Sequence, residues 1–101
     1  MVKTKQEIID KILSNKEKIF SFGVSRLGLF GSFVRDEADE KSDVDFLVVF
    51  SKGKKSYDNL FDLHETLTNL TKRKVEVITD KAISKGFKKH ILSEAEFILQ
   101  S

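Results

Sequence analysis

An Asp-x-Asp pair at the head of a strongly apolar stretch decides more about this chain's fold than any other feature of its sequence. Asp43 and Asp45 flank Val44 and are followed at once by Phe46–Phe50, a run without a polar residue. Such a run predicts a buried strand, and side chains alternate between the two faces of a strand, so both carboxylates project from the same face. Neighbouring carboxylates repel each other, and a hard cation such as Mg²⁺ relieves that repulsion. The stretch therefore predicts a strand that begins with a metal site.

Gly31 and Ser32 stand ten residues before the Asp pair, at the end of a second, shorter apolar segment. A glycine lets the backbone approach a phosphate closely, and a serine offers a backbone N–H and a hydroxyl to phosphate oxygens. Together with the carboxylates, these residues indicate one half of a metal–nucleotide site. Each part alone has a plainer interpretation: acids guard edge strands against aggregation, and Gly-Ser pairs form ordinary turns with a helix cap.

The composite of Gly31-Ser32, ten residues, Asp43-x-Asp45 and an apolar strand resembles the signature of the polymerase-beta-like nucleotidyltransferase superfamily. The short chain is similar to its smallest members, the minimal nucleotidyltransferase (MNT) proteins, many of which are antitoxins paired with a HEPN ribonuclease toxin. The resemblance implies Mg²⁺-dependent transfer of AMP from ATP to a hydroxyl of a partner protein, with two Mg²⁺ ions. By the same resemblance, Asp43 and Asp45 are catalytic metal ligands, and Gly31 and Ser32 contact the β- and γ-phosphates. The implied partner is a HEPN toxin with a tyrosine as acceptor.

Two further residues take roles from this resemblance. Related proteins carry a third acid, commonly Asp, on the strand after the long helix, and this chain has Glu76 at the matching place. The implied role of Glu76 is to bind the metal that activates the attacking hydroxyl, or to accept its proton. Glu is longer than Asp by one carbon–carbon bond, roughly 1.5 Å, which would shift that metal. The alternative is an acid that points into solvent from an edge strand. Arg35 occupies a position where the family often has Arg, and it either contacts phosphates or pairs with the acidic turn that follows.

The predicted order of elements is α-β-α-β-α-β-α. It indicates an α/β (α+β) nucleotidyltransferase fold, a small mixed sheet of three or four strands covered by about four helices, in one domain over residues 1–101. The predicted strands are Leu27–Phe30, Asp43–Phe50 and Lys74–Thr79. The first predicted helix is a long one that runs from the Thr4/Glu7 capping box to Phe20. A short helix at Phe33–Asp36 is capped by Ser32, which would place its N–H groups near a phosphate. Two further helices are predicted at Tyr57–Thr71 and at Ser84–Ser93, the last with Phe87, Ile91 and Leu92 buried. The tail Ala95–Leu99 is apolar enough to pack, in a conformation that its pattern leaves open.

Composition narrows the chemistry and the partners. The chain has no cysteine, which excludes thiol catalysis and zinc–thiolate sites and fits a reducing compartment. It has no P-loop motif, no aromatic-rich nucleic-acid motif, no apolar signal segment and no run long enough to span a bilayer. Residues 36–45 hold six acids against one lysine, and residues 52–90 hold ten Lys or Arg against five acids, which suits an anionic substrate carrying a metal. We expect a cytoplasmic protein that binds neither a membrane nor, directly, nucleic acid.

Two other classes of function stay open at this stage. The chain could be a binding module that neutralises its partner sterically while its site is vestigial, an interpretation to which Glu76 lends some support. It could instead be a nucleotidyltransferase that acts on a small molecule or an RNA end, although 101 residues leave little room for an acceptor pocket or a basic groove. A homodimer would supply the missing wall of such a site, and the sequence leaves the oligomeric state open.

Overall fold

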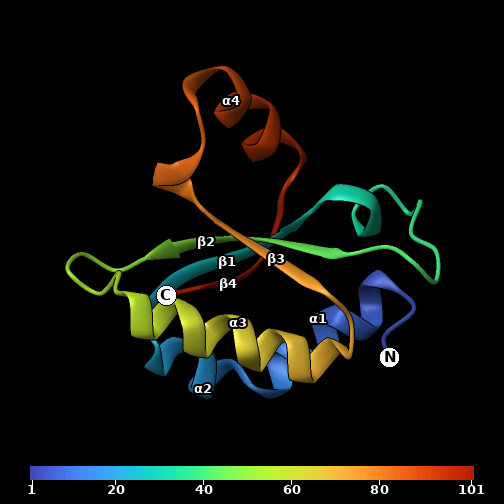
Figure 1. The fold of residues 1–101 in the computed structure, drawn as a ribbon, viewed down its shortest axis with the longest axis horizontal. Coiled ribbons are helices and arrows are strands. Elements are labelled where there is room, and N and C mark those ends of the chain that lie inside the picture. The colour runs from blue at the N-terminus through green and yellow to red at the C-terminus, as the bar shows by residue number, and fades with distance from the viewer.

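The computed structural model describes residues 1–101 and contains a four-stranded mixed sheet with the strand order β3-β2-β1-β4 (Figure 1). β1 is antiparallel to both β2 and β4, whereas β2 and β3 run parallel. The strands are β1 Val24–Phe30, β2 Val44–Phe50, β3 Val75–Thr79 and β4 Glu96–Gln100, and the helices are α1 Lys5–Ser14, α2 Lys16–Ser21, α3 Tyr57–Thr71 and α4 Lys85–Glu94. The predicted α/β fold, with three or four strands and about four helices, is confirmed.

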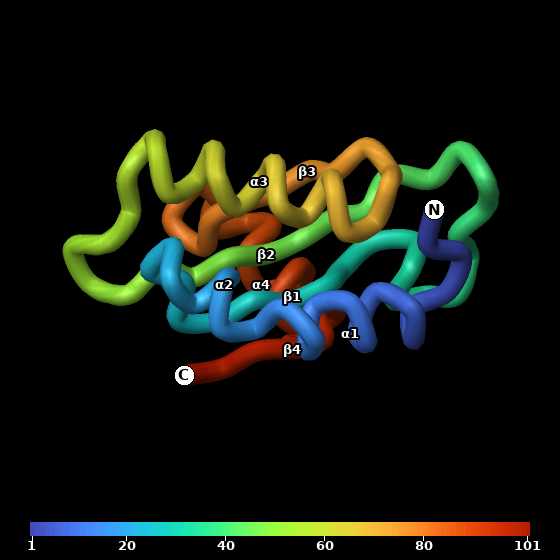
Figure 2. The backbone as a smooth tube through the Cα atoms, turned by 90° about the horizontal axis from the view of Figure 1, so that it is seen from below, coloured from blue at the N-terminus to red at the C-terminus, as the bar shows by residue number.

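Three of the four helices cover one face of the sheet, and α4 lies on the opposite side (Figure 1). Seen from the helical side, α3 runs over β3 and β2, while α1 and α2 run over β1 and β4 (Figure 2). Val44, Phe46 and Val48 of β2 belong to the core beneath these helices. Because strand side chains alternate, Asp45 faces the other side of the sheet. The sheet therefore separates an apolar half from a half that is free to carry polar chemistry.

The N-terminal helix is broken where a continuous one was predicted. Thr4 caps α1 as expected, since its hydroxyl accepts a hydrogen bond from the Glu7 N–H at 3.1 Å. At Asn15 the side-chain amide donates to the Lys11 carbonyl at 2.9 Å, and the Asn15 N–H turns to the Ile12 carbonyl instead. The Lys11 carbonyl is the one that the Asn15 N–H would bond in a continuous helix, so the side chain ends α1 by competing with the backbone.

The long helix α3 occupies Tyr57–Thr71, as predicted. Ser56 caps it by accepting from the Asn59 N–H at 3.1 Å, and Leu63 and Leu67 are fully buried in the core. The helix is followed by the C-cap residue Lys72, whose φ of 57° lies in the left-handed region. No helix of the structure combines the length and the apolar character that crossing a membrane requires.

The C-terminal helix α4 departs from its prediction. Phe87, Ile91 and Leu92 were expected to be buried, but Phe87 is 66% exposed, Leu92 is 38% exposed, and no residue of the helix is fully buried. An apolar stripe can be buried only where a facing surface exists, and the apolar face of the sheet is already covered by the other three helices. The tail after α4 forms β4, which pairs with β1 through Leu27 and Leu99.

Candidate active site

The carboxylates of β2 and β3 lie side by side on the sheet face opposite the helical core. Asp45 and Glu76 are direct partners in the parallel register of these two strands. The pKa of Asp45 is raised from 3.8 to about 6, first by burial and then by the charges of Glu76 and Asp43 and a hydrogen bond with Glu76. Burial and the nearby charges of Glu76 and Asp43 therefore disfavour the ionised form of Asp45.

Glu76 agrees in part with each of its two interpretations. It is exposed and β3 is an edge strand, as expected for an acid that points into solvent. It is also the nearest register partner of Asp45 and perturbs that carboxylate, as expected for a third acid of the site. No three His, Cys, Asp or Glu side chains of the structure converge into a group that could by itself hold a metal ion. The role of Glu76 therefore stays a prediction.

Gly31 is fitted against Asp45. The antiparallel register places Phe30 opposite Asp45, and Gly31 follows with φ of 82°, in the region that L side chains rarely adopt. A Cβ at this position would overlap Asp45 Oδ2 and lie 3.2 Å from Asp45 Cγ. The glycine is therefore required by the backbone conformation and by the carboxylate that occupies the space of its missing side chain.

The short helix predicted at Phe33–Asp36 is wrong. The segment is a single 3₁₀ turn over Gly31–Phe33 that continues as turns and reaches a left-handed φ of 59° at Asp36. Ser32 lies inside this turn rather than capping a helix, because the N-cap residue is Phe30. One 3₁₀ turn aligns few peptide dipoles, so the expected positive helix end is absent, and Ser32 offers a phosphate its own N–H and hydroxyl groups instead.

Arg35 lies between two acids, one of which sequence reasoning missed. Its Nε donates to Glu37 Oε2 at 3.1 Å, and its Nη1 donates to Glu94 Oε1 at 3.0 Å. The same Glu94 oxygen accepts the Gly31 N–H at 2.8 Å. The bonds from Gly31 and Arg35 lower the pKa of Glu94, and those to Glu37 and Glu94 raise the pKa of Arg35. Pairing with the acidic turn is thus confirmed through Glu37.

The position of Glu94 in the sequence gave only a weak indication that it belongs to the site. It is the last residue of α4, where the carbonyl end of the helix disfavours a negative charge. An acid at such a place has to be stabilised by something outside its own helix. The partner, 63 residues earlier in the chain, could not be read from any local pattern.

Arg73 fixes the turn that leads into Asp43. It is only 7% exposed, yet its guanidinium carries a full charge, which must be satisfied inside the protein. Its partners are backbone carbonyls, those of Val2 at 2.7 Å, Asp39 at 2.9 Å, Glu40 at 3.3 Å and Ser42 at 3.0 Å. One side chain thereby ties the N-terminus to the polar turn at residues 39–42 and holds the approach to the first carboxylate of the site.

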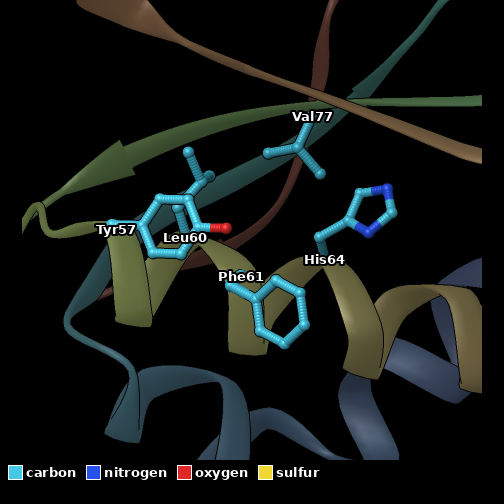
Figure 3. Close-up of a pocket in the computed structure, with 5 residues that line it drawn as sticks. All are labelled: Tyr57, Leu60, Phe61, His64 and Val77. Atoms are coloured by element: carbon cyan, nitrogen blue, oxygen red, sulfur yellow. The ribbon is translucent and has the colours of Figure 1, made fainter.

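An apolar pocket of about 250 Å³ opens between α3 and β3, away from the carboxylates. In Figure 3, Val77 reaches from β3 toward the helix. The five residues that line the pocket are Tyr57, Leu60, Phe61, His64 and Val77. His64 Nε2 forms a hydrogen bond of 2.9 Å with the Val75 carbonyl. Because Glu76 lies between Val75 and Val77 on the strand, its side chain faces the other way. The pocket is therefore not part of the carboxylate site.

A mixed sheet of this topology, with paired carboxylates opening its second strand beside a tight glycine-serine turn, is the arrangement of a nucleotidyltransferase. The chain belongs to the polymerase beta nucleotidyltransferase family, whose profile matches residues 6–101.

Individual relatives extend this assignment. The chain is 37% identical over 94 residues to the protein adenylyltransferase MntA of Thermococcus cleftensis, covering 91% of this chain and 94% of the relative. A solved structure assigned to the minimal nucleotidyltransferases shares 27% identity at a TM-score of 0.72 and covers 87% of this chain and 93% of its own. A tri-AMPylated HEPN toxin in complex with MNT antitoxin, from Shewanella oneidensis, matches at a TM-score of 0.67 and 14% identity, over 95% of this chain and 72% of its own. The last likeness concerns the fold alone.

Proposed function

We propose that this protein transfers AMP from ATP to a hydroxyl group of a partner protein, and that the partner is a HEPN ribonuclease toxin silenced by the modification. The observation that carries the proposal is the carboxylate pair Asp45 and Glu76, side by side on parallel strands, with Gly31 packed against Asp45. The protein adenylyltransferase name of the 37% identical relative supports the reaction class. The solved complex of an MNT antitoxin with an AMPylated HEPN toxin supports the choice of partner.

The carboxylates suit Mg²⁺ by their chemistry. Mg²⁺ prefers oxygen ligands and is usually held by one or two carboxylates together with substrate phosphates. A site of this kind needs no closed group of three protein ligands, which agrees with the absence of such a group here. The pKa of Asp45 is raised first by burial and then by the charges of Glu76 and Asp43, and a divalent cation would offset those charges. Asp43 and Asp45 would hold the ion that accompanies the nucleotide, and Glu76 a second one; bound Mg²⁺ would offset charge on the phosphates.

The protein's own residues would do the rest. Arg35 uses two of its five N–H groups on Glu37 and Glu94, so three remain for phosphate oxygens. Ser32 would add its N–H and hydroxyl to the same phosphates, while Gly31 makes space for the Asp45 carboxylate and donates its N–H to Glu94. The acceptor oxygen would attack the α-phosphorus, its proton would pass to Glu76, and the bond to pyrophosphate would break.

Intact-mass spectrometry of the protein with its toxin partner, before and after addition of ATP and Mg²⁺, tests this function. We expect an AMP-sized gain on the toxin with the wild type and none with Asp43→Asn/Asp45→Asn. Asp62→Asn changes an exposed acid of α3 in the same way and serves as the matched control, so it should transfer as the wild type does. Transfer that survives in the double variant would overturn the proposed reaction.

A sterically acting antitoxin is the second candidate, and the observation that favours it is the exposed Glu at position 76, where related proteins commonly have Asp. Under this alternative the double Asp variant would still form the complex and still block the ribonuclease, with no gain in mass on the toxin. Ribonuclease assays on the same samples therefore separate the two candidates.

A further inference from the structure

Glu94 joins two parts of the phosphate side of the site at a single atom. Its Oε1 accepts the Gly31 N–H at 2.8 Å and the Arg35 Nη1 at 3.0 Å. Hydrogen bonds to an ionised acceptor are the stronger kind, and here both donors meet the same carboxylate oxygen. The conformation of Gly31 and the direction of Arg35 are consequently coupled through one residue at the far end of the chain.

The sheet delivers Glu94 to this position. β4 begins two residues later, and its first residue, Glu96, is the register partner of Leu29 near the end of β1. β1 ends at Phe30, directly before Gly31, so the pairing of β4 with β1 brings the C-terminal end of α4 beside the glycine. The Glu94 side chain is 18% exposed, although no residue of α4 is fully buried. The helix is therefore tied to the site by a polar contact rather than by apolar packing.

The two donors differ in what they can still offer to a ligand. Gly31 has one N–H, and Glu94 takes it. Arg35 keeps three of its five N–H groups after bonding Glu37 and Glu94. An arginine side chain fixed at two of its nitrogens loses little further freedom when it binds a phosphate, so its remaining donors are preorganised.

We propose that Glu94 is a positioning residue of the nucleotide site, holding Gly31 against the Asp45 carboxylate and aiming the free N–H groups of Arg35 at the phosphates of the bound nucleotide. This proposal rests on the nucleotide site of the proposed function. It assigns to the C-terminal segment, which carries none of the family's sequence signature, a direct part in nucleotide affinity.

Titration calorimetry with AMP-PNP and Mg²⁺ on the protein alone tests the assignment without a transfer step, because no partner protein is present to supply an acceptor hydroxyl. We expect Glu94→Ala to raise the Kd roughly tenfold, the loss typical of a hydrogen bond to a charged group. Glu94→Gln keeps an acceptor oxygen at the same reach without the charge, so its Kd should fall between those of the wild type and the alanine variant. Glu96→Ala removes an exposed acid two residues away, which pairs only with Lys5, and should leave the Kd unchanged.

A double-mutant cycle separates positioning from a general structural role. If Glu94 acts through Arg35, then Glu94→Ala should cost clearly less affinity in an Arg35→Ala background than in the wild type. An equal cost in both backgrounds would overturn the proposal. If Glu94→Ala does not fold, as judged by circular dichroism, the same cycle is run with Glu94→Gln.

A decrease of the Kd in Glu94→Ala would be equally decisive. If the Glu94 carboxylate instead occupies the place of a phosphate, its removal would tighten AMP-PNP binding, and that result would overturn positioning. A wild type that binds AMP-PNP but modifies no toxin would overturn the transfer reaction alone and leave the Glu94 result standing. A wild type that binds no nucleotide would overturn both, and an unchanged Kd in Glu94→Ala would overturn only the role of Glu94.

Discussion

The helices α3 and α4 have similar amphipathic patterns and entirely different surroundings. Leu63 and Leu67 of α3 are fully buried against the sheet, and Ser56 caps the helix. α4 buries no residue fully, and its Phe87 is 66% exposed. The comparison shows that an apolar stripe predicts a helix well but predicts burial only where the fold leaves a surface to cover.

The two faces of the sheet also differ in what they contribute to the protein. The face covered by α1, α2 and α3 supplies most of the apolar burial and hence most of the stability. The opposite face carries Asp45 and Glu76, and α4 reaches it mainly through the polar contacts of Glu94. Segments with few buried apolar contacts open at low free-energy cost, so α4 is the part of the fold that we expect to open first.

The largest expected effect tests this division directly. Leu67→Ala removes a fully buried side chain of α3 and should lower the free energy of unfolding by about 3 kcal/mol. Phe87→Ala removes a larger side chain from α4, but one that is mostly exposed, and should change it by less than about 0.5 kcal/mol. Urea denaturation followed by circular dichroism measures both. Comparable losses in the two variants would show that α4 is packed in solution and that the division is wrong.

Arg73 connects the N-terminus to the turn that leads into Asp43. Arg73→Met keeps much of the side-chain volume but leaves several backbone carbonyls without their donor, so the free energy of unfolding should fall by about 2 kcal/mol. Arg73→Lys restores a charge with a single ammonium that cannot reach carbonyls on both sides, and should recover only part of the loss. Full stability in the methionine variant would mean that water satisfies these carbonyls and that the turn before Asp43 needs no clamp.

Much of the fold was predictable because its signals are local. The bounds of α3 follow from a cap and a repeating leucine stripe, and the start of β2 follows from an apolar run that begins behind two acids. Glu76 was identified through the family resemblance, and its register pairing with Asp45 follows from the order of the strands in the sheet rather than from a local pattern. The contacts of Glu94 and Arg73 were missed because each joins segments more than 30 residues apart, and the residue types involved are ordinary on a surface. The break at Asn15 was missed because one side-chain bond overrides the helical pattern around it.

On the face that carries the carboxylates, Gly31 lies against Asp45. Gly31→Ala places a Cβ on the Asp45 carboxylate and forces a side chain into a left-handed conformation, so it should cost about 1–2 kcal/mol of stability and weaken nucleotide binding. Gly86 of α4 has open space around it, and Gly86→Ala should raise stability by about 0.5 kcal/mol through helix propensity. Thermal melts of the two variants provide the comparison. Equal changes of melting temperature in Gly31→Ala and Gly86→Ala would show that Asp45 does not need a glycine beside it.

The smallest expected effect is a pH dependence that arises at Asp45. Its pKa is raised from 3.8 to about 6 by burial, by Glu76 and by Asp43, with Arg35 opposing them. Between those values the folded protein keeps a proton that the unfolded chain releases, so stability falls as the pH rises through this range and the loss is complete above pH 6. The difference between the two pKa values corresponds to about 3 kcal/mol in the free energy of unfolding. Solvent screening at this half-buried site reduces that contribution to about 1 kcal/mol.

Asp45→Asn removes the charge and should therefore be more stable than the wild type at pH 7.5, by about that 1 kcal/mol, and nearly equal to it at pH 4. Urea denaturation at both pH values, in the presence of a chelator and without nucleotide, measures the difference. Asp62→Asn, on the exposed side of α3, should follow the wild type at both. If the stability of Asp45→Asn also equals that of the wild type at both pH values, the carboxylates of β2 and β3 are too well solvated to repel each other. The negative charge of the proposed cation site would then have to come from the bound nucleotide rather than from the fold.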